Sequence, residues 1–424
     1  MDENPSKNGT RGERERGEGM PVIPKIVSVD DHVIEPPTVW TDRLPKKYLD
    51  VGPRVVDKPM KNLSYVGGVL TWEQGDDPAD GPMCSWWYFE DLHYPMVRTH
   101  AAVGFSRDQL QMAPITYAEM IPGAWQRDAR LVDMDRNHMS SSLCFPSWLR
   151  FCGQHLSEGH DKTLGLLCVK AYNDWMVEEW CGESNGRMLP LCIVPLWDAQ
   201  LAADEVRRNA ARGVRAVAFS EIPPNLGMPS IHSGFWDPFF AACSDTHTIV
   251  CMHIGSSSKM PSTSPDAPGA VGSSLVHTNA IFSMVDYLMS GLFVRFPQLK
   301  VMYSEGQAGW LPYMLDRVDI VWDENRAWGG VADKVPNPPS SYVRDHVYFC
   351  VFQDKVAFEN LDVIPVENLT YEVDYPHSDS TWPRSREIAE RHMKKLTQEQ
   401  VNAICRDNAI RLFGLSSEGY WQGA

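Results

Sequence analysis

Short, largely apolar runs recur along the chain, and each ends in turn-forming residues. Several of them lack an alternation of polar and apolar positions, which is typical of parallel strands that are covered on both faces. We predict eight strands from these runs: KIVSVDDH (25–32), SSSLCFP (140–146), MLPLCIVPL (188–196), VRAVAFSE (214–221), HTIVCMHIG (247–255), LKVMYSEG (299–306), HVYFCVF (346–352) and LTYEVDYP (369–376).

Segments with apolar residues at helical spacing lie between the predicted strands. The clearest spans 198–213, where Asp198 can cap the first turn and Gly213 can end the last. The others span 163–182, 277–296 and 309–325. Strands that alternate with helices form parallel βαβ units, and eight such units close most economically as a (β/α)8 TIM barrel. A doubly wound open sheet is the alternative on pattern alone.

Four regions lie outside this alternation. Residues 1–22 have little to bury and are expected to form a disordered N-terminal tail, and 416–424 a C-terminal tail, which leaves 23–415 as a single barrel domain. Residues 33–139 are expected to be a long insertion after the first strand that forms a lid or a surface for a partner. The Ser/Pro/Gly-rich stretch 256–274 is expected to be a loop over the barrel mouth.

Composition narrows the classes of partner. The formal net charge is −16, a field that repels nucleic acid and anionic membranes, so neither is expected as a partner. No apolar run is long enough to span a bilayer, and the first twenty residues lack the apolar core of a signal peptide. The ten cysteines are scattered without a C-x-x-C pair and are predicted to be buried thiols of a reducing compartment. We therefore expect a cytoplasmic protein.

Acidic and histidine side chains stand where the predicted strands end. Because the active site of a barrel lies at the C-terminal ends of its strands, these positions are candidates for chemistry. Asp30 and His32 share one face of the first strand, whereas Asp31 points to the other. The fourth, fifth, sixth and eighth strands end near Glu221, His253, Glu305, Asp374 and His377, and Glu35 follows the first strand.

These side chains together predict a metal site. Carboxylates and imidazoles gathered without Lys or Arg would repel one another and lose hydration, unless a cation lies among them. The core ligands are predicted to be Asp30, His32, His253, Glu305 and Asp374. Any one of them alone would more often be a hydrogen-bonded rim residue.

The sequence resembles the amidohydrolase superfamily, and within it the amidohydrolase-related family that also contains nonoxidative decarboxylases. The matching blocks are VSVDDHVIEPPTVW (27–40), EMIPGAWQRDARLVDMDRN (119–137), CFPSWLRFCGQ (144–154), AYNDW (171–175), SIHSGFWDP (230–238), FPQLKVMYSEGQAGWLPYMLDRVD (296–319), YEVDYPHSDSTWP (371–383) and DNAIRLFGL (407–415). This resemblance implies a metal-containing (β/α)8 barrel.

The resemblance also implies roles for single residues. The first-strand His-x-His motif of the family falls on Asp30 and His32, and its fifth-strand histidine falls on His253. Its eighth-strand aspartate, which binds metal and takes a proton from the attacking water in hydrolases, falls on Asp374. The sixth-strand histidine is replaced by Glu305, which weakens an interpretation as a decarboxylase.

Additional donors raise the expected number of ions. With Glu35, Glu305 and His377 in the set, there are enough ligands for one or two divalent ions per chain, and oxygen-rich ligands suit iron or manganese at least as well as zinc. The ligand set also resembles a small branch of the superfamily that binds dinuclear iron or manganese and activates oxygen.

The first functional hypothesis is a metal-dependent hydrolase of a small amide, ester or lactone, with Asp374 as general base and Glu305 as a further catalytic ligand. The alternatives are a dinuclear iron or manganese monooxygenase, a nonoxidative decarboxylase and an inactive barrel that supports an active paralogue. Glu221, His277 and His138 are candidate contacts to a small-molecule substrate. Arg384 is the only arginine in the segments expected at the rim of the barrel. A homo-oligomer, or an oligomer with a paralogue, is expected.

Overall fold

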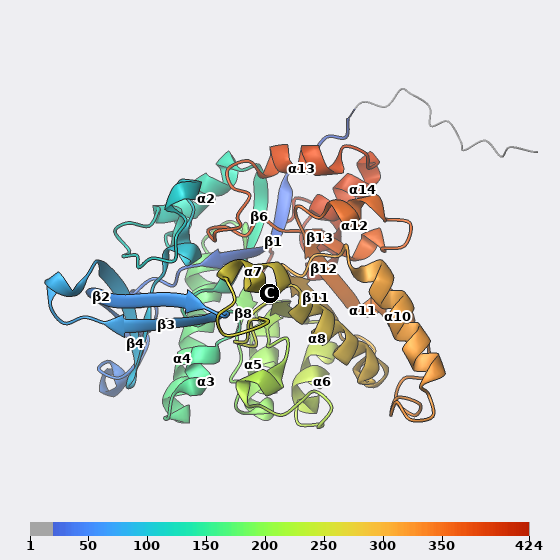
Figure 1. The fold of residues 1–424 in the computed structure, drawn as a ribbon, viewed down its shortest axis with the longest axis horizontal. Coiled ribbons are helices and arrows are strands. Elements are labelled where there is room, and N and C mark those ends of the chain that lie inside the picture. Colours follow the sequence, from blue (N-terminus) through green and yellow to red (C-terminus); the bar gives the residue numbers. More distant parts are fainter. Residues whose placement is uncertain (1–19, 424) are drawn as a thin grey trace, which may run out of the picture.

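The structure is a computed structural model that describes residues 20–423 (Figure 1). Residues 1–19 of the predicted N-terminal tail lie outside the described residues. Each of the eight predicted strand segments contains a strand. The third is split in two at Pro190, which has no N–H group to donate to a neighbouring strand. The strands are β1 (Ile26–Val33), β6 (Met139–Pro146), β7 (Met188–Leu189), β8 (Leu191–Cys192), β9 (Ala216–Ala218), β10 (Ile249–His253), β11 (Val301–Ser304), β12 (Val347–Val351) and β13 (Leu369–Tyr371).

These strands form two parallel sheets, with the orders β1-β6-β7 and β8-β9-β10-β11-β12-β13. The chain that follows β13 is hydrogen-bonded to β1. The Asp374 N–H donates to the Asp30 carbonyl at 2.9 Å, and the His32 N–H donates to the Tyr375 carbonyl at 2.6 Å. The carboxyl ends of the first and last strands therefore lie side by side.

The helices between the strands agree with the expected alternation, and α4, α5, α6, α8 and α10 follow one another in chain order across the view (Figure 1). Asp198 caps α5 by accepting the N–H groups of Gln200 and Leu201, as predicted. The longer helices are α2 (Arg127–Arg136), α4 (Lys162–Trp175), α5 (Ala199–Ala210), α6 (Asp237–Thr246), α8 (Thr278–Met289), α10 (Leu311–Glu324) and α13 (Ser385–Met393). The shorter ones are α1 (Thr38–Thr41), α3 (Gln154–Glu158), α7 (Gly269–Leu275), α9 (Leu292–Arg295), α11 (Val343–His346), α12 (Lys355–Glu359), α14 (Gln398–Asn402) and α15 (Asn408–Phe413).

The segment between β1 and β6 contains an antiparallel sheet that the sequence pattern did not indicate. Its order is β3-β2-β4-β5, and its strands are β2 (Arg54–Val66), β3 (Val69–Gln74), β4 (Met83–Phe89) and β5 (Leu92–Pro95). The hairpin of β2 and β3 points toward α7 (Figure 1). At its tip the N–H of Gly67 donates to the Ala267 carbonyl at 3.4 Å, so the hairpin contacts the Ser/Pro/Gly-rich loop.

The C-terminal residues pack on the parallel strands. Ser141 donates its hydroxyl to the Gly419 carbonyl at 2.5 Å, and the Trp421 indole donates to the Gly213 carbonyl at 3.0 Å. All ten cysteines are free and buried, as expected. Within residues 20–423, no helix has the length and apolar character needed to cross a membrane.

Candidate metal centre

Strand β1 supplies two residues of the site on one face. Asp30 and His32 point into the site, and both are completely buried. Asp31 lies on the opposite face, where its carboxylate accepts hydrogen bonds from the Ser142 hydroxyl at 2.5 Å and from the Tyr375 N–H at 3.0 Å. The alternation predicted for this strand is confirmed.

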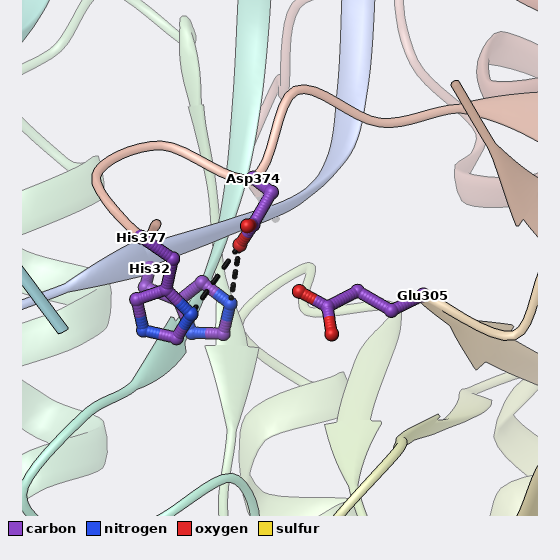
Figure 2. Close-up of side chains that lie close together, drawn as sticks. All are labelled: His32, Glu305, Asp374 and His377. Atoms are coloured by element: carbon purple, nitrogen blue, oxygen red, sulfur yellow. Dashed lines mark ion pairs between the residues drawn. The ribbon is translucent and has the colours of Figure 1, made fainter. Parts of the chain in front are cut away.

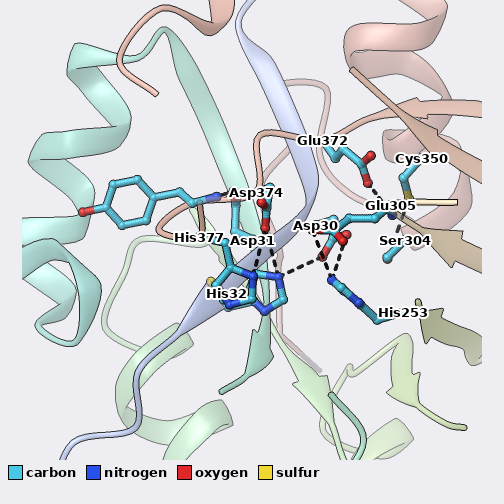
Figure 3. A network of polar contacts seen from close by, with 12 residues as sticks. Asp30, Asp31, His32, His253, Ser304, Glu305, Cys350, Glu372, Asp374 and His377 are labelled. Atoms are coloured by element: carbon cyan, nitrogen blue, oxygen red, sulfur yellow. Dashed lines mark hydrogen bonds and ion pairs between the residues drawn. The ribbon is translucent and has the colours of Figure 1, made fainter. Parts of the chain in front are cut away.

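His253, the last residue of β10, faces Asp30. Its Nδ1 lies 2.6 Å from the Ile254 carbonyl, and this contact directs Nε2 toward the carboxylates. Nε2 lies 3.6 Å from an oxygen of Asp30 and 3.6 Å from an oxygen of Glu305 (Figure 3). The Phe151 ring stacks on the imidazole with centroids 4.0 Å apart and covers it.

Two carboxylates of the site stand on strained backbone. Glu305 follows β11 with φ +54°, and Asp374 follows β13 with φ +58°. Residues other than glycine rarely adopt this left-handed conformation, which costs on the order of 1–3 kcal/mol and is concentrated at functional sites. The strain indicates that the position of these carboxylates is fixed by the surrounding structure.

Asp374 is flanked by two imidazoles. One of its oxygens lies 3.1 Å from Nε2 of His32 and 3.4 Å from Nδ1 of His377. The two rings are stacked, with centroids 3.4 Å apart, and Glu305 faces them from the other side (Figure 2).

The donors form two overlapping groups. His32, Glu305, Asp374 and His377 each offer one ligand atom, and these atoms lie within 4.8 Å of one another. Asp30, His32 and His253 form a second group under the same criterion. His32 belongs to both, so the two groups adjoin.

Many polar atoms of these groups make no hydrogen bond to the described residues. They include both oxygens of Asp30 and of Asp374, both ring nitrogens of His32, and Nε2 of His253 and of His377. Buried polar atoms are almost always paired in proteins, so this concentration calls for an additional partner. A bound cation would give these buried atoms a partner. The residues of the site therefore fit a metal ion.

Burial sets the ionisation of the site. It raises the pKa of Asp30 and of Asp374 well above the ordinary value, and the charges of neighbouring carboxylates raise both further. Burial also lowers the pKa of His32 and of His377 well below the ordinary value. Neutral imidazoles are the form that binds metal, and a cation would return the carboxylates to their charged form.

Glu35 is not part of the cluster. Its carboxylate accepts hydrogen bonds from the backbone N–H groups of Ser147, Trp148 and Leu149, at 3.1, 3.0 and 3.4 Å. The structure does not place it in either donor group, so we reassign it from metal ligand to anchor of the loop after β6.

Glu221 also anchors a loop. One of its oxygens accepts the Gly255 N–H at 2.9 Å, the Ser257 hydroxyl at 2.9 Å and the Asn279 amide at 3.0 Å. The structure therefore places it beneath the loop after β10, and the substrate contact expected of it stays a prediction.

The two remaining candidates stand apart from the donors. His138 lies at the start of β6, the end opposite the site, where Nε2 contacts the Ile23 carbonyl at 3.0 Å. The structure therefore does not bring His138 to the donors. His277 directly precedes α8 and lines a cavity of about 380 Å3 together with Gln307 and Trp310.

The sequence analysis missed Glu372. Its side chain is completely buried, and its Oε2 accepts the N–H of Glu305 at 2.9 Å (Figure 3). Burial and the charge of Glu305 raise its pKa well above the ordinary value. The available signal was its place in the sequence: Glu372 lies in the apolar segment 369–376, two residues before Asp374, where the last strand ends.

Comparisons with known proteins identify the family. The family model described as Amidohydrolase matches residues 90–415. The chain therefore belongs to the amidohydrolase family and is an enzyme of that family, which confirms the resemblance seen in the sequence. No curated protein matches the chain.

Solved structures share the fold at low sequence identity. An amidohydrolase from Mycobacterium avium subsp. paratuberculosis is 20% identical, with 92% of this chain and 99% of that chain covered and a TM-score of 0.65. The 2,6-dihydroxybenzoate decarboxylase from Rhizobium is 16% identical, with 92% and 99% covered and a TM-score of 0.56. The 5-carboxyvanillate decarboxylase from Novosphingobium aromaticivorans, solved with manganese, is 18% identical, with 68% and 80% covered and a TM-score of 0.54. The fold is TIM-barrel-like and of the α/β class.

Proposed function

We propose that this chain is a metalloenzyme that holds two divalent ions and uses dioxygen to cleave a small organic substrate, or to hydroxylate it with two electrons from an external reductant. The observation that carries the proposal is the pair of adjoining donor groups, which contain three imidazoles and three carboxylates, with Glu372 beside them. One ion would leave several of these buried donors without a partner. Sites that mix carboxylates with a few imidazoles also hold the metal pair in di-iron and di-manganese proteins.

The residues divide between the two ions by their grouping. Asp30, His32 and His253 would hold one ion, and Asp374 and His377 would hold the other. Glu305 belongs to the second group and also lies 3.6 Å from His253 of the first, so it could hold either ion. Iron or manganese at these positions would supply redox chemistry with dioxygen.

The chain itself keeps water away from most of the donors. Phe151 stacks on His253, and the Phe145 ring meets the same imidazole edge-on at 5.3 Å. Asp30, His32 and Asp374 are completely buried. Such enclosure protects reactive species from hydrolysis and strengthens the electrostatic interactions within the site.

The proposal is tested by oxygen consumption. The protein is loaded with ferrous iron under anaerobic conditions and then exposed to dioxygen. It is expected to consume dioxygen in proportion to its iron content, whereas zinc-loaded protein and the Asp30→Asn variant are not expected to consume it. Iron-loaded protein that leaves dioxygen untouched, with or without candidate substrates, would contradict an oxygenase. Turnover of amides, esters or lactones by the zinc form would then favour the hydrolase.

Decarboxylation is the second candidate, because two of the solved structures that share the fold are decarboxylases. It predicts release of carbon dioxide from aromatic acids by the manganese-loaded protein without oxygen. The buried carboxylates Glu305 and Glu372 argue against it, because they repel a substrate carboxylate near the metal. Carbon dioxide release under anaerobic conditions would overturn the oxygenase proposal.

Four further expectations belong to this proposal. The hydrogen bonds between β1 and the chain after β13 support closure of the parallel strands into one (β/α)8 barrel domain over 23–415. The contact of the β2–β3 hairpin with the loop 256–274 supports a lid formed by the insertion 33–139. Ten buried free thiols support a cytoplasmic location. We still expect the enzyme to form an oligomer, and measurement of its mass in solution would test this.

A further inference from the structure

A cavity of about 890 Å3 lies beside the metal centre. His377, a residue of the second donor group, lines this cavity, as does Asp379. Its volume is at the upper end of the range found for small-molecule sites, about 300–1,000 Å3. The cavity can therefore admit a substrate that extends well beyond the reacting atoms.

Three aromatic residues from separate parts of the chain line the cavity. Phe105 belongs to the segment between β5 and α2, Phe352 follows β12, and Trp382 precedes α13. These aromatic side chains would contact the carbon skeleton of a substrate without contributing charge.

The same cavity is lined by three arginines. Arg384 caps the start of α13 and Arg391 lies seven residues later on the same face of that helix, whereas Arg107 comes from the segment between β5 and α2. All three are exposed, and none makes an ion pair or a side-chain hydrogen bond with residues 20–423. By contrast Arg386, on another face of α13, pairs with Glu390 at 2.9 Å.

Unpaired arginines on one cavity are notable in a chain whose net charge is −16. The cavity also contains two acidic side chains. Asp379 lies two residues after His377, and Glu387 lies between Arg384 and Arg391 in the sequence. Three cationic and two acidic side chains therefore line the cavity, which gives its lining an excess of positive charge.

We propose that this arginine cluster, Arg107, Arg384 and Arg391, binds an anionic group of the substrate, a carboxylate or a phosphate, at a distance from the reacting atoms. This inference rests on the proposed function, because it assigns the substrate class to the same site. The guanidinium group binds both kinds of anion through paired N–H donors. The substrate is then an organic acid or phosphate ester whose apolar part lies between the arginine cluster and His377.

Binding of simple anions tests the inference. The probes are benzoate and phenyl phosphate, with benzamide as the neutral control, titrated calorimetrically into the metal-loaded protein and into the metal-free protein. The variants are Arg384→Gln with Arg391→Gln as a double substitution, and Arg386→Gln as the matched control on the same helix.

At least one anionic probe is expected to bind the wild type more tightly than benzamide does, with or without metal. The double variant should weaken this binding about tenfold or more, and Arg386→Gln should leave it within about twofold. Binding of benzoate alone or phenyl phosphate alone identifies the anion. Equal binding of benzamide, unchanged binding in the double variant, or no binding of either anion to the wild type would overturn the inference.

The metal content of each variant separates this inference from the function it rests on. If anion binding requires the metal and is unchanged in the arginine variant, the anion binds to the metal ions. This result would refute the proposed role of the arginine cluster and leave the metal centre supported. Arginine-dependent binding in a protein that never takes up metal refutes the metal centre and leaves the anion site in place.

Discussion

Glu35→Gln tests whether this carboxylate anchors a loop or binds metal. Glu35 is completely buried and accepts three backbone N–H groups. Burial raises its pKa from 4.5 to about 7, although these hydrogen bonds act in the opposite direction. The substitution preserves the shape of the side chain and removes its ability to ionise.

The expected effect depends on pH, and its sign follows from proton linkage. Between pH 4.5 and about pH 7 the folded protein holds a proton at Glu35 that the unfolded chain has released. Raising the pH across this window therefore lowers the free energy of unfolding of the wild type. At about 1.4 kcal/mol per pH unit, the full loss is about 3 kcal/mol, and Glu35→Gln should not show it.

Glu35→Gln also has a constant cost. The carbonyl oxygen can still accept from Ser147 and Leu149, which both bond to Oε1, whereas the new NH2 group meets the Trp148 N–H. One unsatisfied buried donor costs about 1–3 kcal/mol. The variant should be less stable than the wild type near pH 5, and the difference should shrink or reverse near pH 8.

Urea denaturation between about pH 5 and pH 8 measures this difference. Glu119→Gln is the control, because Glu119 is exposed and also accepts a backbone N–H, from Thr116 at 2.8 Å. Parallel pH profiles for wild type and Glu35→Gln would refute the reasoning about burial. Loss of bound metal in Glu35→Gln, with folding intact, would restore Glu35 as a ligand.

Three other substitutions probe the surroundings of the site. Gly67→Ala places a Cβ atom 2.5 Å from the Pro265 carbonyl oxygen, whereas the Cβ atom of Gly330→Ala meets nothing within 4 Å. In urea denaturation, Gly67→Ala should therefore lower the free energy of unfolding by about 1–2 kcal/mol more than Gly330→Ala does. Equal losses would show that the contact between the hairpin and the loop does not stabilise the protein. Phe151→Leu removes the ring stacked on His253 and should weaken metal affinity about tenfold at unchanged secondary structure, whereas unaltered metal titrations would show that the ring only fills space. Glu372→Gln keeps an acceptor for the Glu305 N–H but removes a charge, so metal affinity should again fall about tenfold in the same titration; unchanged affinity would exclude an electrostatic role.

The parallel strands could be predicted because burial on both faces makes them continuously apolar. β10 and β12 are buried at every position. β2, in contrast, has only two buried residues among thirteen, so its sequence shows little of the pattern that marks a strand. Its pairing with β3 and β4 is a tertiary effect that local hydrophobicity does not encode.

The site shows a similar division. The donors Asp30 and His32 could be predicted because a strand fixes which side chains share a face. Glu35 lies only three residues beyond His32, but in a loop, and there the direction of a side chain depends on which N–H groups approach it. The arginine cluster joins residues of the helix α13 to Arg107, far away in the sequence, so spacing alone could not bring them together.

The metal content of the purified chain tests the central claim most directly. Protein reconstituted with ferrous iron or manganese and freed of excess metal should retain about two ions per chain. Asp30→Ala, Glu305→Ala and Asp374→Ala should each retain fewer, and Glu35→Gln should match the wild type. A single zinc ion per chain under all loading conditions would contradict the dinuclear centre and favour the hydrolase. No retained metal in any form would contradict the metal centre itself.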